Sequence, residues 1–331
     1  MKANPHQINR RSFLQRTSTT ALTLAILPTQ AATGNPPNAR RRALRVAHLT
    51  DIHVSNKPGA PEGMAAALRH AQSLADRPDL LLFGGDCIGD ALYTPMKDVL
   101  PQWELWDRVL KAELKLPAYQ CLGNHDIFGW MQRGKPGVEQ DPAYGKPLAL
   151  ERLGLKTGYY SFDRAGWHFI VLDSMQYEAN NWGYVGLLDE PQFNWLEQDL
   201  ATTPTATPVC VLSHIPIFSA AAFFDGKLDP ARNWSVPGAS MHIDAKRIKD
   251  LFYQHPKVKL CLSGHLHLID DVTYLGVRYL CNGAVCGGWW KGKNQEFGPI
   301  YAVLDLYTDG SVERQILDYG PPRPEAVKPE K

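Results

Sequence analysis

The sequence predicts an α/β protein, in which short buried strands alternate with amphipathic helices. The strand signal is a series of short runs that are almost entirely apolar, as expected for strands covered on both faces. These runs are residues 44–49, 80–83, 118–122, 169–172, 208–212 and 258–262. Helix-like segments separate them, at residues 64–75, 102–114, 192–200 and 243–253. Such alternation is the pattern of the α/β class.

The helical segments carry local signals of their own. Pro61 and Pro191 stand just before two of them, where proline is tolerated at the start of a helix. The last segment has apolar residues near the helical period, at Ile243, Ile248, Leu251 and Phe252.

The rhythm of the sequence changes near the C-terminus. Residues 272–280, 300–307 and 312–319 are typical of strands, with turn signals at residues 275–276 and 309–310. We therefore expect antiparallel pieces beside the main strands.

The composition excludes several classes of protein. The chain has 331 residues, of which 44% are hydrophobic and 21% charged, so it can bury a substantial core and is neither disordered nor fibrous. Its formal net charge is only +1, which gives no basic field for a nucleic-acid polymer. Beyond the N-terminal leader, no apolar run approaches the roughly 20 residues that cross a bilayer. Residues 43–320 contain no break in pattern and are interpreted as one domain.

The first 32 residues have the three parts of an export signal in the right order. A basic start with Arg-Arg-Ser-Phe-Leu at residues 10–14 precedes an apolar stretch at residues 21–27, and small residues follow at Ala31 and Ala32. The paired arginines followed by Phe-Leu resemble the twin-arginine class, which implies export of the folded protein to the periplasm or beyond. The apolar stretch is too short and too rich in threonine for a stable membrane anchor. Residues 33–42 are predicted to be a flexible linker and residues 321–331 a disordered tail.

Six cysteines in an exported protein raise the question of disulfides. Four of them, Cys121, Cys210, Cys261 and Cys281, lie inside apolar runs, where free cysteine behaves as a small hydrophobe. The total is too small for a disulfide scaffold in a chain of this length. The sequence leaves open whether Cys281 pairs with Cys286.

Polar side chains suited to metal binding follow five of the predicted strands directly. The segments are Thr50-Asp51-Ile52-His53, Gly84-Gly85-Asp86, Gly123-Asn124-His125-Asp126, Ser213-His214 and Ser263-Gly264-His265-Leu266-His267. Each is weak evidence alone, because a histidine after a strand is commonly a capping or core residue and Gly-Asp is commonly a turn. Together they place ligands at the carboxyl ends of strands, where the sites of open α/β sheets form. The ordered set therefore predicts one functional centre.

The types of side chain indicate which chemistry this centre supports. Carboxylate, amide and imidazole ligands suit first-row metals such as Mn, Fe or Zn. Asp86 offers two oxygens and is assigned as the bridge between two ions. One site is completed by Asp51, His53 and His267, and the other by Asn124, His214 and His265. Two neighbouring ions bind a phosphoryl oxygen and lower the pKa of a shared water, which predicts hydrolysis of a phosphoric ester.

In this order the five segments resemble the signature of the calcineurin-like metallophosphoesterases: Asp-x-His, Gly-Asp, Gly-Asn-His-Asp, a later His, and Gly-His-x-His. The blocks extend from Asp51 to His267, over most of the chain after the leader. The resemblance implies a four-layer α/β/β/α sandwich of two mixed sheets flanked by helices, two divalent or trivalent metal ions, and the ligand set given above. It also implies that His125 is a general acid for the leaving group rather than a principal ligand, with Asp126 orienting its ring.

Two departures narrow the resemblance. The Asp-Arg-Gly run of serine/threonine protein phosphatases is absent after Asp86, and Gly89 stands where purple acid phosphatases have a metal-bound tyrosine. The block at residues 186–189, with Gln192 and Trp195, is more similar to bacterial cyclic-nucleotide phosphodiesterases or general phosphohydrolases. A small phosphorylated substrate is therefore expected, with a nucleotide as one candidate.

Three further residues are assigned to substrate binding: Asn282, His242 and Trp289. Asn282 is expected close to the centre if its strand runs beside the one that ends at Gly264. Trp289 could stack on a base or another planar group, or else be a core residue or a subunit contact. His242 begins a helix, where an anion is favoured, although a structural role is equally compatible with the pattern.

The sequence thus predicts an exported phosphoric ester hydrolase, in which a metal-bound hydroxide attacks phosphorus in line and His125 assists the leaving group. Two alternatives are kept. The same centre could cleave a pyrophosphate bond, as nucleotide pyrophosphatases do, or the chain could be a non-catalytic binding protein, which would normally show lost ligands. The natural substrate, the choice between monoesters and diesters, the identity of the metals and the oligomeric state stay open.

Overall fold

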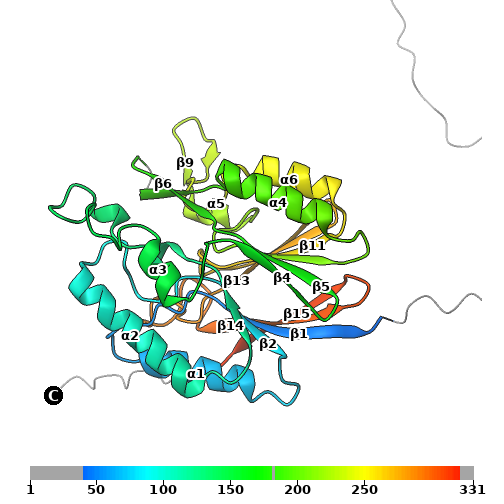
Figure 1. The fold of residues 1–331 in the computed structure, drawn as a ribbon, viewed down its shortest axis with the longest axis horizontal. Coiled ribbons are helices and arrows are strands. Elements are labelled where there is room, and N and C mark those ends of the chain that lie inside the picture. The colour runs from blue at the N-terminus through cyan, green and yellow to red at the C-terminus, as the bar shows by residue number, and fades with distance from the viewer. Residues whose placement is uncertain (1–39, 181–182, 321–331) are drawn as a thin grey trace, which may run out of the picture. The chain divides into compact units, whose positions relative to one another are not determined.

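Two β-sheets pack face to face, and each carries helices on its outer side (Figure 1). This arrangement comes from a computed structural model that describes residues 40–180 and 183–320. The four layers are helices, sheet, sheet and helices, which confirms the predicted fold class. The predicted export signal, residues 33–39 of the linker and the tail at residues 321–331 lie outside the described residues.

The first sheet has the strand order β15-β14-β1-β2-β3. Its strands are β1 (Arg42–Leu49), β2 (Leu80–Phe83), β3 (Ala118–Gln120), β14 (Ile300–Tyr307) and β15 (Val312–Asp318). The first three are parallel, whereas β14 and β15 add to the β1 edge in antiparallel fashion. Helices α1 (Ala60–Gln72) and α2 (Met96–Glu113) connect the parallel strands and cover the outer face.

The second sheet has the strand order β12-β13-β11-β8-β5-β4. Its strands are β4 (Tyr160–Arg164), β5 (Trp167–Val171), β8 (Val209–Leu212), β11 (Val258–Ser263), β12 (Ile269–Tyr274) and β13 (Val277–Asn282). The four inner strands are parallel, and the edge strands β4 and β12 are antiparallel to their neighbours. Helices α4 (Glu190–Thr202) and α6 (Ala245–Gln254) cover its outer face. The antiparallel pieces expected near the C-terminus are therefore present at the edges of both sheets.

Successive apolar side chains of a strand point to opposite faces of the sheet, and both faces are covered. In β1, Val46 points into the layer between the sheets, while Ala47 points toward α1 and α2. Both side chains are fully buried. This double burial explains why the predicted strands are continuous in apolar character.

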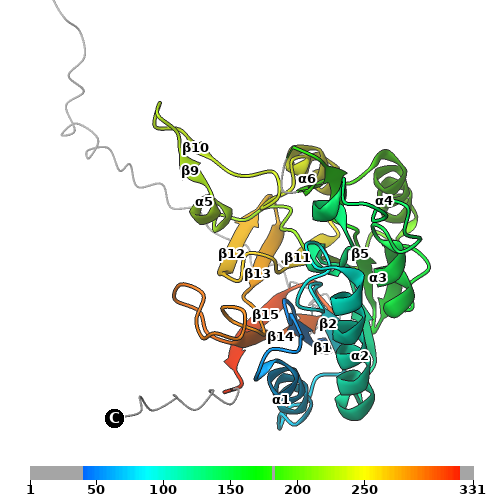
Figure 2. The ribbon, with the colours of Figure 1, turned by 90° about the vertical axis from the view of Figure 1, so that its left-hand side faces the viewer.

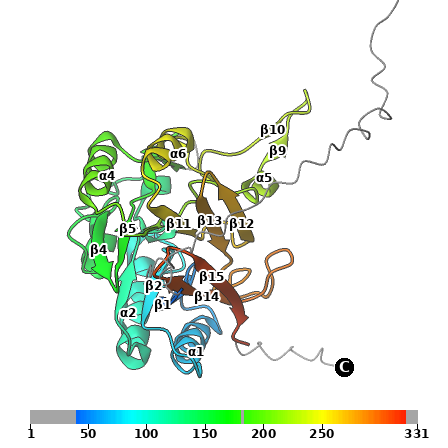
Figure 3. The same ribbon diagram turned by 90° about the vertical axis from the view of Figure 1, so that its right-hand side faces the viewer.

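Shorter elements complete the fold and were not predicted. They are α3 (Pro147–Arg152), α5 (Ala222–Asp225), the β6 (Met175–Glu178) and β7 (Gly183–Gly186) ribbon, β9 (Lys227–Leu228), β10 (Trp234–Ser235), and 3₁₀ turns at Asn124–Asp126 and Trp130–Gln132. The β9–β10 hairpin projects from the body of the protein (Figures 2 and 3).

Most element boundaries differ from prediction by a few residues, as at α1, α4, α6 and β5, and two of the differences have identifiable reasons. Helix α2 begins at Met96 and continues through Pro101, although the prediction began it after this proline; proline removes one backbone hydrogen bond without preventing the helix from forming. Strand β3 ends at Gln120 because the backbone then turns into the segment that starts at Gly123.

All six cysteines are buried and free, which settles the open question of a Cys281–Cys286 disulfide. The thiol of Cys281 donates to the carbonyl of Gly264 at 3.2 Å, and the sulfur of Cys286 lies 3.8 Å from Nδ1 of His267. In the described ranges, no helix is long and apolar enough to span a bilayer.

Candidate metal centre

The five predicted ligand segments meet at the carboxyl ends of β1, β2, β3, β8 and β11. Their side chains form clusters whose potential ligand atoms lie within 4.8 Å of one another. Asp86 belongs to a cluster with Asp51 and His53 and to a second cluster with His214 and His265. A carboxylate shared by two clusters is the arrangement that a bridging ligand requires.

The first cluster joins residues from three strand ends. The Nε2 atom of His53 lies 3.4 Å from Oδ2 of Asp86 and 3.2 Å from Nε2 of His267. The same atom of His267 lies 3.3 Å from Oδ1 of Asp51. Two imidazole nitrogens and two carboxylates thus converge on one point.

The second cluster lies on the other side of Asp86. The Nε2 atom of His214 is 3.3 Å from Oδ2 of Asp86 and 3.1 Å from Oδ1 of Asn124. The ring of His265 packs edge-on against that of His214, with 5.1 Å between their centres. The structure therefore brings together every residue predicted as a metal ligand.

Backbone carbonyls orient the ligand rings. Nδ1 of His214 donates to the carbonyl of Gly84 at 2.7 Å, and Nδ1 of His267 donates to the carbonyl of Gly287 at 2.7 Å. These bonds fix the tautomer and leave Nε2 of each ring free to face the carboxylates, as hydrogen bonds to the outer nitrogen of a ligating histidine do in metal sites.

The backbone itself is shaped for these ligands. Asp51, His53, Asp86, His265 and His267 all have φ between 49° and 70°, in the left-handed region that non-glycine residues rarely adopt. Such outliers gather at functional sites.

Two glycines let the ligand segments approach one another. A Cβ atom at Gly123 would stand 2.0 Å from the backbone nitrogen of Asp86, and one at Gly264 would stand 2.1 Å from Oδ2 of Asp51. Only glycine fits at either position without moving a ligand.

The protonation states suit metal binding. Burial lowers the pKa of His53 and of His265 to about 3, so both rings are neutral and can offer a lone pair. Burial alone would raise the pKa of Asp51, but the neighbouring His267 overrides it and lowers that pKa to about 2. Burial also opposes the charged forms of His214 and His267, but the neighbouring acidic groups outweigh it, raising the pKa of His214 to about 9 and that of His267 above its usual range. Metal binding at these two rings would therefore release a proton from each. Imidazoles, carboxylates and an amide oxygen, all buried and convergent, fit a pair of divalent cations.

His125 stands beside the two clusters. Its backbone N–H donates to Oδ1 of Asp86 at 2.8 Å, and its ring nitrogen Nδ1 donates to Oδ1 of Asp90 at 3.0 Å. Burial lowers the pKa of His125, but the charges of Asp86 and Asp90 outweigh it and the pKa is raised overall. The ring is therefore stabilised as an imidazolium with Nε2–H available as a donor.

Asp126 does not orient the His125 ring, which corrects the prediction. Its carboxylate accepts the backbone N–H groups of Cys87 and Gly123, both at 2.8 Å, so it holds two ligand loops together. Burial, reinforced by the charge of Asp86, raises the pKa of Asp126 to about 7. Asp90 takes the orienting position instead. Its place four residues after Asp86 was visible in the sequence, but no pattern linked it to His125.

A cavity of about 320 Å³ opens onto the metal centre. Besides several ligands and His125, it is lined by Tyr184, Pro237, Ala239, Ser240 and Trp289. Of these only Trp289 was predicted, because the others come from β7 and from the segment after the projecting hairpin, whose positions the sequence does not specify.

Trp289 forms a wall of the cavity. Its ring centre lies 4.0 Å from that of His53, 4.8 Å from that of His125 and 5.4 Å from that of His267. Its neighbour Trp290 turns away, donating from Nε1 to the carbonyl of His53 at 3.0 Å. The aromatic wall therefore adjoins both the metal ligands and the candidate acid.

Two residues predicted to bind substrate do not line the cavity. Asn282 is fully buried, and its side chain contacts Nδ1 of His48 at 2.9 Å and the guanidinium of Arg314 at 3.1 Å. His242 is also buried, between Ser213 at 3.3 Å and Asp244 at 3.0 Å. Both side chains are occupied by structural hydrogen bonds, so the prediction for them is corrected.

Comparison with known proteins agrees with this geometry. A family model described as Calcineurin-like phosphoesterase matches residues 44–268. The chain is 25% identical over 280 residues to a 3′,5′-cyclic-nucleotide phosphodiesterase of Nostoc sp. (strain PCC 7120), covering 81% of this chain and 90% of the relative. It is 25% identical over 295 residues to the 3′,5′-cyclic adenosine monophosphate phosphodiesterase CpdA of Escherichia coli K12, covering 85% and 91%. A solved dimetal phosphatase from Danio rerio superposes with a TM-score of 0.58 at 14% identity, covering 84% of this chain and all of the other, and so has the same fold.

Proposed function

The chain belongs to the calcineurin-like phosphoesterase family and is a metal-dependent phosphoric ester hydrolase, and from this premise we propose that it hydrolyses 3′,5′-cyclic nucleotides. Its cofactors are two divalent metal ions, whose identity stays open. The two cyclic-nucleotide phosphodiesterases that it resembles over most of its length support this substrate class.

The lining of the active-site cavity carries the proposal. Among the described residues that line it, none is lysine or arginine. A phosphodiester has a single negative charge, whereas a monoester or a nucleotide pyrophosphate has two or more near neutral pH and is commonly held by additional basic side chains. Trp289 offers an aromatic face for a planar base. A diester that carries a base, such as a cyclic nucleotide, fits this combination best.

The side chains around the centre suggest how the reaction is assisted. When bound, two divalent ions would neutralise the phosphoryl oxygens and lower the pKa of a nucleophilic water. His125 then donates its Nε2 proton to the departing ribose oxygen, while Asp90 holds the opposite nitrogen of the ring. Trp289 limits the access of water beside these groups and orients the base.

Hydrolysis by the purified protein tests the substrate class. The mature chain, loaded with Mn, Fe or Zn, is assayed with 3′,5′-cyclic AMP, AMP, and a dinucleotide joined by a pyrophosphate bond. We expect kcat/KM for the cyclic diester to exceed that for AMP by more than about tenfold, because the second negative charge of AMP meets no lysine or arginine among the described residues of the lining. A tenfold difference corresponds to about 1.4 kcal/mol. A preference for AMP would indicate a phosphatase. Release of two phosphorylated fragments from the dinucleotide would indicate a pyrophosphatase. Nucleotide binding without metal and without turnover would indicate a binding protein.

We also propose that the protein works in the periplasm or outside the cell. The order of the segments in the N-terminal leader supports this location, because the paired arginines are followed by an apolar stretch and then by small residues. A double substitution, Arg10→Lys with Arg11→Lys, should retain the precursor in the cytoplasm of a bacterium with twin-arginine export. Cell fractionation measures the effect, with Arg16→Lys as the matched control. Undiminished export of the double variant would contradict the proposal.

A further inference from the structure

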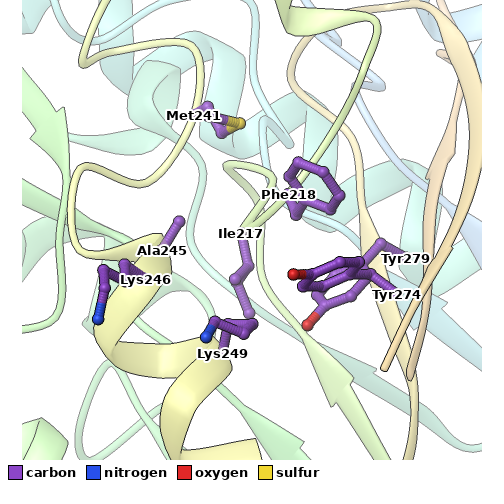
Figure 4. A pocket seen from close by; sticks show the side chains of 8 residues that line it. All are labelled: Ile217, Phe218, Met241, Ala245, Lys246, Lys249, Tyr274 and Tyr279. Atoms are coloured by element: carbon purple, nitrogen blue, oxygen red, sulfur yellow. The ribbon is translucent and has the colours of Figure 1, made fainter. Parts of the chain in front are cut away.

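We propose that a second cavity, distinct from the one at the metal ligands, binds a small aromatic anion. This cavity of about 450 Å³ lies between α6, the β12–β13 hairpin and the segment that follows β8 (Figure 4). Small-molecule sites have such volumes, with mostly apolar walls and a few polar groups. It shares no lining residue with the cavity at the metal centre, so it is a separate site.

Three aromatic rings give the cavity its preference for a planar ligand. The ring centre of Phe218 lies 6.0 Å from that of Tyr274 and 5.7 Å from that of Tyr279. Phe218 is 36% exposed and Tyr274 is 48% exposed, so part of the aromatic surface of this cluster is accessible to water. A flat apolar ligand placed between these rings and Ile217 would remove this surface from water.

Tyr279 adds a polar contact inside the cavity. Its side chain is buried, and among the described residues no hydrogen bond to its hydroxyl group is found. Figure 4 shows the hydroxyl groups of Tyr274 and Tyr279 pointing toward the side of the cavity where Lys249 lies. The hydroxyl oxygen of Tyr279 is not among the fully buried polar atoms that lack a partner, so it is accessible from the cavity and a polar atom of a ligand would be able to hydrogen-bond to it.

The charge at the cavity favours an anion. Lys246 and Lys249 line the α6 side, and no acidic residue is among the described residues of the lining. Both lysines also contact Asp250, so these three groups together carry one net positive charge. A ligand with a single negative group balances that charge, whereas a cation would be repelled.

Fluorescence titration of the full mature chain with 1-anilinonaphthalene-8-sulfonate, an aromatic sulfonate, tests the proposal. We expect saturable binding at one site. Tyr274→Ala and Lys249→Gln should each raise Kd by about tenfold, the effect of losing one good contact, while Lys249→Arg should keep it close to the original value. Tyr279→Phe, which removes only the hydroxyl oxygen, should raise Kd by a few-fold.

Trp234→Ala is the matched control, because Trp234 is an exposed aromatic residue on the projecting hairpin, outside the cavity. It should leave Kd unchanged, and all variants should keep the thermal midpoint of the parent. Three results would overturn the proposal: a Kd unaffected by Tyr274→Ala and Lys249→Gln, a Kd raised by Trp234→Ala instead, or equally tight binding of the uncharged N-phenyl-1-naphthylamine.

Discussion

The hydrogen bond between Asp90 and His125 should control turnover of substrates with poor leaving groups. Asp90→Asn removes the negative charge that faces Nδ1 of His125 at 3.0 Å but keeps an oxygen at the same place. That charge favours the imidazolium form of His125, which is the form able to protonate a departing oxygen. The substitution therefore weakens the acid without deleting its ring.

The environment of the Asp90–His125 hydrogen bond sets the size of the expected loss in kcat. A hydrogen bond to a charged group contributes about 1.5–3 kcal/mol, and each 1.36 kcal/mol in the barrier is a factor of ten. Because the side chains of Asp90 and His125 are only 21% and 17% exposed, solvent screening is incomplete. The loss in kcat should therefore be about 10- to 100-fold for cyclic AMP.

The assay compares two leaving groups. Cyclic AMP releases an alkoxide, which needs a proton, whereas bis-p-nitrophenyl phosphate releases a stable phenolate, which does not. We expect Asp90→Asn to lower kcat for cyclic AMP by about 10- to 100-fold and to change kcat for bis-p-nitrophenyl phosphate by less than about threefold. Elemental analysis should show that the variant retains both metal ions.

Two control variants make this test specific. Thr94→Val removes a hydroxyl that donates to the other oxygen of Asp90 at 2.5 Å, so it disturbs the loop but leaves the His125 contact intact. Asp126→Asn changes the carboxylate that the sequence analysis assigned to orient the His125 ring. Equal losses with both substrates in Asp90→Asn, or the leaving-group dependence appearing in Asp126→Asn instead, would refute the reasoning.

Three further outcomes follow from the structure. Asp86→Ala should release both ions, because its carboxylate serves both clusters; two ions per chain by elemental analysis would disprove the bridge. Gly264→Ala should displace Asp51 and lower both metal content and activity, whereas Gly298→Ala, with open space around its Cβ, should preserve them. The pKa of His168 is raised by hydrogen bonds and charges from Asp199 and Asp163, which outweigh its burial, so it stabilises the fold fully below its unfolded pKa of about 6.5 and less as the pH rises through the folded value. His168→Gln should therefore lower the thermal midpoint more at about pH 6 than at about pH 9, and an equal loss at both values would contradict this linkage.

The metal ligands could be predicted because each lies within a few residues of the end of a short strand. A strand such as β2 is recognisable from four apolar residues, and Asp86 lies three residues beyond its end. The parallel arrangement then brings such ends to one edge. Neither step requires knowledge of the loops, so sequence position alone was sufficient.

The residues that position the acid and shape the cavity depend on loop paths instead. Asp90 meets His125 only because residues 87–95 fold back over the 3₁₀ turn at Asn124–Asp126, where the N–H of Ala91 bonds to the carbonyl of His125. Tyr184 and Ser240 reach the same cavity from a ribbon and from a long connection. No local pattern encodes these paths.

Asn282 shows a different limit of sequence reasoning. Its strand β13 does run parallel to β11, as the prediction required. However, successive side chains of a strand point to opposite faces, and Asn282 points toward His48 and Arg314 rather than toward the cavity. Knowing a strand's neighbour therefore does not determine which of its side chains reaches a site.

The left-handed backbone at the ligands explains why the centre behaves as one unit. Each such residue costs roughly 1–2 kcal/mol relative to ordinary backbone, and the cost is offset by contacts between different loops. The N–H of Asp51 bonds to the carbonyl of Gly85, the N–H of His53 to the carbonyl of Asp86, and the N–H of His265 to the carboxylate of Asp51. Since each loop is held by another loop, no ligand segment can keep its geometry alone. The complete metal centre thus requires both sheets, because its ligands follow β1, β2 and β3 of the first sheet and β8 and β11 of the second.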